Sequence, residues 1–161
     1  MNDVLEWVEK AALENMRGHA QSADALAKEA GTTLTILLAM LSGAFAYALR
    51  ASDLVGAVAL TAYLFALCVV LVINCMMIGE FPAITNEPRN LNQKGYDLDA
   101  IRSVELRNIQ ERIDQAARRN AITARWLNRV RIGAICSPLV FAVAIFAAGL
   151  VHRGAQAVAA G

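Results

Sequence analysis

The sequence predicts an all-α integral membrane protein. It predicts three transmembrane helices, an N-terminal amphipathic helix and a long cytosolic helix that is continuous with the third span. Three runs without a charged residue carry this prediction, 32–49, 54–79 and 132–151, with 18, 26 and 20 residues. A helix needs ~20 apolar residues to cross a hydrocarbon core ~30 Å thick. The remaining parts, 1–31, 80–131 and 152–161, are then an N-terminal cytosolic helix, a cytosolic loop with a heptad-patterned helix, and a short external tail.

Residues 3–30 are expected to form the amphipathic helix. Apolar residues recur there at steps of three and four, as on one face of an α-helix. They are Leu5, Val8, Ala12, Met16, Ala20, Ala23 and Ala27. Most are alanines, so this face permits close packing but buries little apolar area. After it, Gly31 either forms a hinge or lies within a helix that continues into the first span.

The distribution of charge predicts the orientation. Residues 80–131 carry ten of the fifteen Lys and Arg residues, and such residues accumulate in short loops on the cytoplasmic side. The connection Arg50–Asp53 has one base and is too short to hold structure. The first two spans should therefore be antiparallel neighbours with their connection outside. The N-terminus is then cytoplasmic, and the apolar run that starts near residue 32 is not a removable signal peptide.

The helix that follows the 80–96 connection carries a second pattern. Prolines, asparagines and Gly95 predict that the connection is irregular. An unbroken heptad seam follows it. Its members are Leu106, Ile109, Ile113, Ala116, Asn120, Thr123, Leu127 and Val130. Asn120 at a core position sets register either in a homo-oligomer or against the N-terminal helix of the same subunit, and the pattern leaves both open. No breaker separates this helix from the third span, so residues 98–151 are expected as one helix, kinked at Pro138.

Five arginines stand in an acid-free run just before the third span. They are Arg118, Arg119, Arg125, Arg129 and Arg131. With Trp126 among them, they indicate either a topology signal with an interfacial aromatic anchor or a binding site for lipid headgroups or an anionic nucleotide. No glycine-rich loop of the kind that cradles a phosphate accompanies them.

The apolar runs contain few polar side chains. Asn74 is the most polar residue deep in a span and is expected to make an interhelical hydrogen bond, with lining of a polar pore as the alternative. No ionisable Asp, Glu, Lys, Arg or His lies within a run, which argues against a proton relay or a voltage sensor. The three cysteines show no metal-ligand spacing. The sequence therefore predicts neither an enzyme nor a cofactor.

The order of elements resembles a known family. The stretch Ala23–Ala30 leads into Thr33–Leu37, and a tight membrane hairpin, a Pro88-Arg89 pair, a long cytosolic helix and a last membrane helix follow. This resembles the small transmembrane effectors of bacterial anti-phage nucleotide-signalling systems, the Pycsar- and CBASS-type membrane effectors. Many of those show an Asp-x-Lys-Ala pattern before their first membrane helix, whereas Asp24 and Lys28 stand further apart here. The resemblance implies a multi-pass, oligomeric protein of the bacterial inner membrane that damages or permeabilises the membrane when triggered.

These observations favour a channel-like effector that perturbs the membrane when triggered, in anti-phage defence. The alternatives are a membrane anchor or adaptor subunit for a cytosolic partner, and a holin-like lysis protein. The expected partners are membrane lipids, further copies of the chain, and a cytosolic protein or nucleotide as trigger, without DNA binding. Small residues in the first span favour close approach of helices. They are Ser42, Gly43, Ala44 and Ala46.

The charge distribution yields a direct test of topology. The predicted outer side carries only two basic residues, Arg50 and Arg153. A periplasm-active reporter fused after Gly161 should therefore be active. The same reporter inserted near Lys94 should be silent. The opposite pattern of reporter activity would contradict a cytoplasmic N-terminus.

Overall fold

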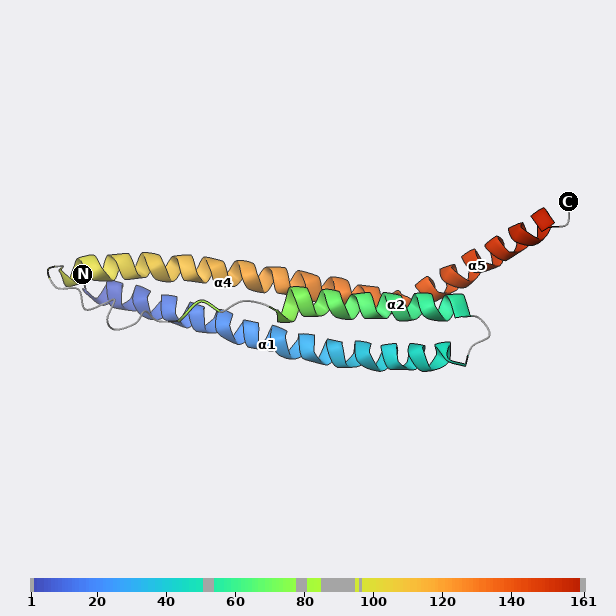
Figure 1. Ribbon diagram of the computed structural model, residues 1–161. Helices are drawn as coiled ribbons and strands as arrows, with labels where there is room; N and C mark the ends of the chain where they lie inside the picture. Colours follow the sequence, from blue (N-terminus) through green and yellow to red (C-terminus); the bar gives the residue numbers. More distant parts are fainter. Residues whose placement is uncertain (1, 51–53, 78–80, 85–94, 96, 160–161) are drawn as a thin grey trace. The chain divides into compact units, whose positions relative to one another are not determined.

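The computed structural model describes residues 2–50, 54–77, 81–84, 95 and 97–159, without the side chains of residues 2, 3, 5 and 152–159. Within these residues all regular secondary structure is helical, which confirms the all-α prediction. The helices are α1 (Asn2–Ala48), α2 (Leu54–Leu71), the π-helix η1 (Val72–Met76), α4 (Leu98–Ile135) and α5 (Ser137–Ala159) (Figure 1). The Pro88-Arg89 pair and most of the 80–96 connection lie outside the described residues.

The number of helices suited to a membrane is two or three. The segments Glu6–Ala48 and Leu54–Met76 are each long and apolar enough to cross. Helices α4 and α5 supply a third candidate if the bent pair counts as one span.

Helix α1 is a single helix of 47 residues. It passes Gly31 without a break, so the N-terminal amphipathic segment and nearly all of the first apolar run belong to one helix (Figure 1). On its exposed surface the Lys10 ammonium lies 2.8 Å from a Glu6 carboxylate oxygen, which lowers the pKa of the Glu6 carboxyl. Such exposed pairs add little to stability.

The chain divides into two compact units. Unit 1 comprises residues 1–28 and 79–124, and unit 2 comprises residues 29–78 and 125–161. Helices α1 and α4 contribute to both units, so the helical backbone passes from one unit to the other at two places.

In unit 1, the first part of α1 packs against the first part of α4. Met16 of α1 and Ile109, Ile113 and Ala116 of α4 form the buried core. The Asn120 amide donates a hydrogen bond to the His19 carbonyl of α1 at 2.9 Å. These contacts show the second of the two arrangements predicted for the heptad seam, packing on the N-terminal helix of the same chain. Self-association through the seam stays a prediction.

Unit 2 contains the rest of α1, the whole of α2 and η1, the end of α4, and α5. Helix α2 packs against α5, and the rings of Tyr47 in α1 and Phe141 in α5 meet edge to face with centroids 6.1 Å apart. The seam residues Leu127 and Val130 of α4 are buried here. Hydroxyl groups in the apolar helices donate to carbonyls four residues earlier, as in Ser42 to Leu38 and Thr61 to Ala57, so they need no partner on another helix.

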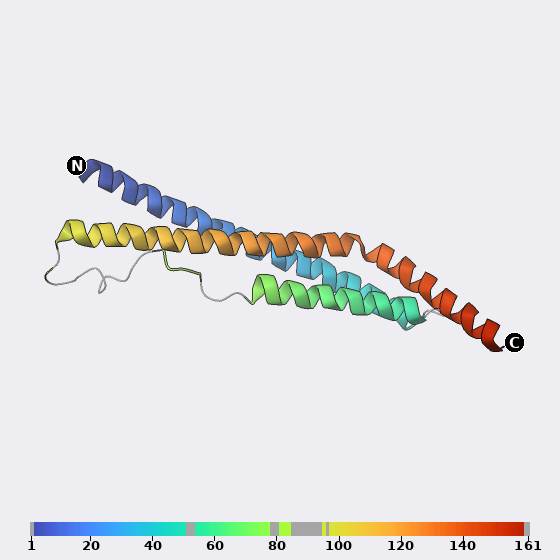
Figure 2. The ribbon, with the colours of Figure 1, turned by 90° about the horizontal axis from the view of Figure 1, so that it is seen from above.

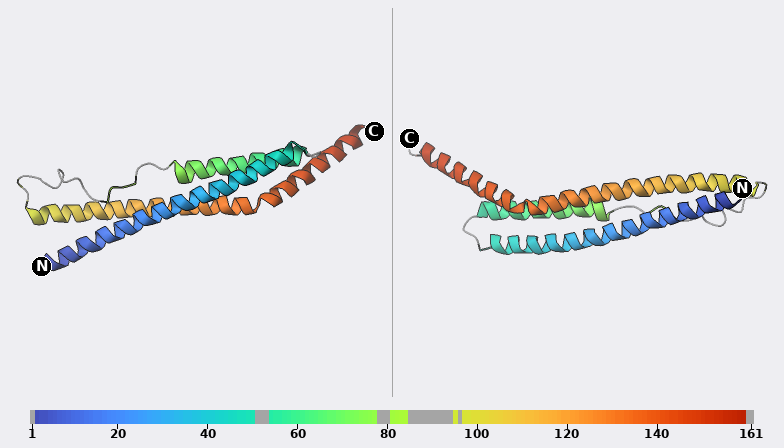
Figure 3. Two further views of the ribbon diagram at one scale, coloured as in Figure 1. Left: turned by 90° about the horizontal axis from the view of Figure 1, so that it is seen from below. Right: turned by 180° about the vertical axis from the view of Figure 1, so that it is seen from behind.

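The helix predicted over 98–151 is divided at Cys136. There α4 and α5 meet with a bend of 50° (Figures 2 and 3). Pro138 explains the bend, because proline has no N–H for the carbonyl four residues earlier and its ring clashes with that carbonyl. The N–H groups of Leu139 and Val140 both donate to the Cys136 carbonyl, at 3.0 and 3.2 Å. The prediction of one uninterrupted helix is wrong at this point, and the predicted kink is confirmed. Helix α5 then continues to Ala159, so most of the predicted tail has helical backbone.

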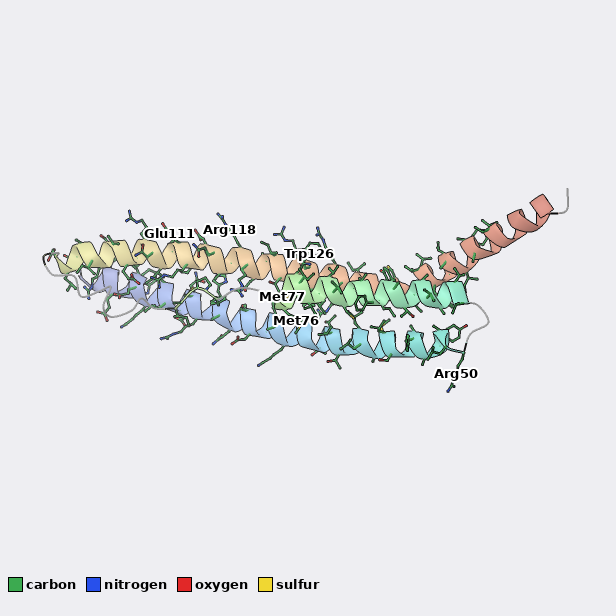
Figure 4. The ribbon with its side chains drawn as sticks, in the orientation of Figure 1. Arg50, Met76, Met77, Glu111, Arg118 and Trp126 are labelled. Carbon is green, nitrogen blue, oxygen red and sulfur yellow. The ribbon has the colours of Figure 1, made fainter. Side chains whose placement is uncertain are left out.

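The second apolar run ends in a π-helix that the sequence did not predict. The Met77 N–H donates to the Val72 carbonyl at 2.8 Å, a bond that spans five residues. The Asn74 amide donates to the Val70 carbonyl at 2.9 Å. Met76 and Met77 are exposed at this end of the helix (Figure 4).

The packing of unit 1 can be tested by placing a charge in its core. Ile113→Asp should lower the melting temperature markedly, because an unpaired charge in an apolar core is costly. Ile122→Asp is the matched control, since Ile122 lies on the same helix and is 48% exposed. The mass in detergent, measured by light scattering, should be the same for both variants and the parent. A fall of the Ile113→Asp mass toward that of the monomer would instead assign the seam to self-association.

Candidate functional site

The end of α4 in unit 2 is tied to α1 and to α2. The Arg131 guanidinium lies 3.0 Å from a Glu29 carboxylate oxygen of α1, and its Nε donates to the Thr33 hydroxyl at 3.3 Å. Two residues further on, the Tyr63 hydroxyl of α2 donates to the Gly133 carbonyl at 2.9 Å. We call these five residues the α4 junction. It lies immediately before the bend at Cys136.

The contact of Arg131 with α1 is specific in geometry but modest in energy. The Arg131 and Glu29 side chains are 41% and 53% exposed, and exposed ion pairs contribute ~0.2–1 kcal/mol. Thr33 is buried and its hydroxyl also donates to the Glu29 carbonyl at 2.8 Å. The arginine is therefore held in place by two groups, yet it can be released at low energetic cost.

The contact with α2 depends on the absence of a side chain at Gly133. A Cβ at this position would lie 2.9 Å from Leu67 Cδ2 and 3.2 Å from the Tyr63 hydroxyl oxygen. Glycine thus lets α2 approach close enough for the Tyr63 hydrogen bond. Neither residue was singled out from the sequence. The available signal was a glycine one turn before a predicted proline kink, together with a tyrosine inside an apolar run.

The five arginines of the acid-free run have different surroundings. Arg119 lies over the Phe81 ring at 5.6 Å, Arg129 lies over the Trp126 ring at 4.9 Å, and Arg131 pairs with Glu29. Arg118 and Arg125 are exposed, and Arg118 projects away from α4 (Figure 4). Arg119, Arg129 and Arg131 are thus each engaged by a different group of this chain.

In unit 1, arginines hold the segment Phe81–Ile84 against α4. Arg112 donates to the Ala83 carbonyl at 3.3 Å and pairs with Glu105 at 2.8 Å. Both side chains of this pair are largely buried. Phe81 and Ile84 also pack on the core of unit 1. Arg112 lies outside the acid-free run, and sequence reasoning missed its role.

Asn74 and a small cavity in unit 1 do not indicate a ligand site. Asn74 bonds within its own helix, and its interhelical role stays a prediction. A cavity of about 200 Å³ in unit 1, lined by Glu9, Arg102 and Glu105 among others, is smaller than the ~300–1,000 Å³ of ordinary small-molecule sites. Among the residues that the structure describes, no group of three or more His, Cys, Asp or Glu side chains is placed to hold a metal ion.

No family model matches the sequence, and comparisons with curated proteins and with solved structures found no similar protein.

The α4 junction makes a specific prediction about stability. Tyr63→Phe removes only the hydroxyl, so the Gly133 carbonyl loses its partner. The free energy of unfolding in bilayers should fall by about 0.6–1.7 kcal/mol, the range of interhelical hydrogen bonds in membranes. Tyr47→Phe is the matched control, because its ring against Phe141 is retained. Equal stability of the two variants would show that the hydroxyl contributes nothing.

Proposed function

We propose that this chain is an oligomeric, channel-like effector of the bacterial inner membrane, with a cytoplasmic N-terminus and three spans, that perturbs the membrane when triggered from the cytosol. One observation supports this most. Helix α4 enters unit 2 without a break, is tied to α1 and α2 at Arg131 and Gly133, and ends at the 50° bend before α5. A displacement of α4 would therefore act directly on the bend.

The mechanism requires two arrangements of the junction that differ little in free energy. The half-exposed Arg131–Glu29 pair suits this role, since breaking it costs ~1 kcal/mol or less. The bend at Pro138 gives α5 a point about which to move, because backbone groups around a proline are satisfied by neighbours rather than by the helix itself. A ligand then shifts the balance only through its different affinity for the two arrangements.

The trigger is expected to be anionic or to have an acidic surface. In unit 1 the exposed Arg118 is available to a phosphate-bearing nucleotide or an acidic protein. In unit 2, Arg125, Trp126 and Arg129 suit anionic lipid headgroups. Arg119 is less suited to recognition, because it lies over Phe81.

An adaptor subunit for a cytosolic partner is the second candidate. One observation favours it. Glu111 and Arg118 project from the same side of α4 in unit 1 (Figure 4), and both are exposed. A protein partner with complementary charges could bind that side without any change at the bend.

Measurement of membrane potential during induced expression tests the effector function. We expect depolarisation, entry of an excluded dye and growth arrest. Glu29→Gln should lower the expression level at which depolarisation begins, because it removes the ionic part of the α4 junction. The charge swap Glu29→Arg with Arg131→Glu should restore the parental threshold.

The control is Arg107→Gln, which removes a charge from an exposed position of α4 in unit 1. It should leave the threshold unchanged. If the parent protein inserts into the membrane and leaves both the potential and dye exclusion untouched, the effector function is wrong and the adaptor function takes its place.

A further inference from the structure

The hairpin of α1 and α2 in unit 2 has an open apolar groove. Its volume is about 630 Å³, and its lining contains both bulky and small residues. Phe45 and Phe65 are the bulky aromatic members, and Ser42, Ala48, Thr61 and Ala62 are the small ones. The Ser42 and Thr61 hydroxyls donate to carbonyls of their own helices at 2.8 Å. The groove therefore suits an apolar occupant.

The groove faces away from the chain's own α4 and α5. Tyr47, which contacts Phe141 of α5, stands two residues after Phe45, and two residues correspond to about 200° around a helix. Likewise Tyr63, which bonds to Gly133 of α4, stands two residues before Phe65. Phe45 and Phe65 of the groove therefore lie nearly opposite the side chains of the same helices that contact Phe141 of α5 and Gly133 of α4.

Helix α5 carries an apolar ridge that its own chain leaves uncovered. Leu139, Val143, Phe146 and Leu150 recur at steps of four and three, so they share one face. All four are more than half exposed, with Phe146 at 70%. Phe141, the contact of Tyr47, lies on the opposite face of the helix. Unit 2 thus presents a groove on one pair of helices and a separate ridge on α5.

We infer that the groove receives the α5 ridge of a second copy of this chain. Small residues beside bulky ones accept the side chains of a neighbouring helix, and such packing drives helix association in membranes. The depths also agree, given the proposed three-span topology. Phe45 is the fourteenth residue of the run 32–49 and Phe146 the fifteenth of the run 132–151, and both runs start at the cytosolic side.

Because groove and ridge are different surfaces of one unit, two copies either exchange both contacts around a two-fold axis or associate head-to-tail. Head-to-tail interfaces close into a ring or continue as an open chain, and each copy then uses its ridge on one neighbour and its groove on another. The inference rests on the proposed membrane insertion and orientation of the spans, and it supplies the interface that an oligomeric effector needs.

Disulfide cross-linking between two differently tagged copies tests the interface. In a background with Cys68, Cys75 and Cys136 replaced by Ala, one copy carries Phe45→Cys and the other carries Phe146→Cys. Oxidation in native membranes should give a product that bears both tags. Because each copy has one thiol, this product arises only between chains.

The matched control replaces Phe45→Cys by Ala46→Cys, an exposed neighbour that does not line the groove. Its yield with Phe146→Cys should be several-fold lower. Equal yields from both pairs, or no product while both thiols still react with a maleimide, would overturn the inference. Transfer of a photoreactive acyl chain to the groove in place of cross-linking would equally overturn it and assign the groove to lipid.

The failures of the two proposals are distinguishable. Cross-linking without depolarisation leaves the interface standing and contradicts the effector function. Depolarisation without cross-linking contradicts the interface alone.

Discussion

The hydrogen bond from the Tyr63 hydroxyl to the Gly133 carbonyl is the interaction on which the arrangement of unit 2 depends. A hydrogen bond between helices in a membrane is worth about 0.6–1.7 kcal/mol. Gly133 lies in the last turn of α4 before the break, and the Tyr63 hydroxyl of α2 donates to its carbonyl. The same glycine leaves room for that donor, since a Cβ there would crowd both Leu67 and Tyr63. Gly133 and Tyr63 therefore act together immediately before the bend.

Much of the fold could be predicted because it depends on short-range patterns. The apolar runs and the heptad seam are local patterns that predicted α-helices, and Pro138 is a local feature that predicted the bend. The junction could not be predicted in this way, because Tyr63 and Gly133 are 70 residues apart and nothing in their spacing links them. The π-helix at Val72–Met76 likewise depends on how backbone bonds are distributed after folding. The arginines look alike in sequence, but their roles differ, because the fold brings Phe81 to Arg119 and Glu29 to Arg131. Trp126, by contrast, is a local neighbour of Arg129 on the same helix.

Two ion pairs that α4 makes differ in how far solvent reaches them. Arg112 and Glu105 are largely shielded from solvent, and removing one partner of such a pair leaves a costly unpaired charge. This pair is suited to hold the Phe81–Ile84 segment permanently. Arg131 and Glu29 remain partly hydrated, so either can exchange its partner for water. A permanent contact in unit 1 and an exchangeable one in unit 2, on the same helix, favour a change at the unit 2 end of α4 over a change at its unit 1 end.

The cysteines of the chain have unequal access. Cys68 and Cys75 are buried, whereas Cys136 is exposed and forms the single non-helical residue between α4 and α5. A thiol-reactive fluorophore or spin label added to the unaltered protein would therefore attach preferentially at the bend. The natural sequence thus carries its own attachment point for a spectroscopic reporter, at the place where a change in backbone direction would alter the probe's surroundings most.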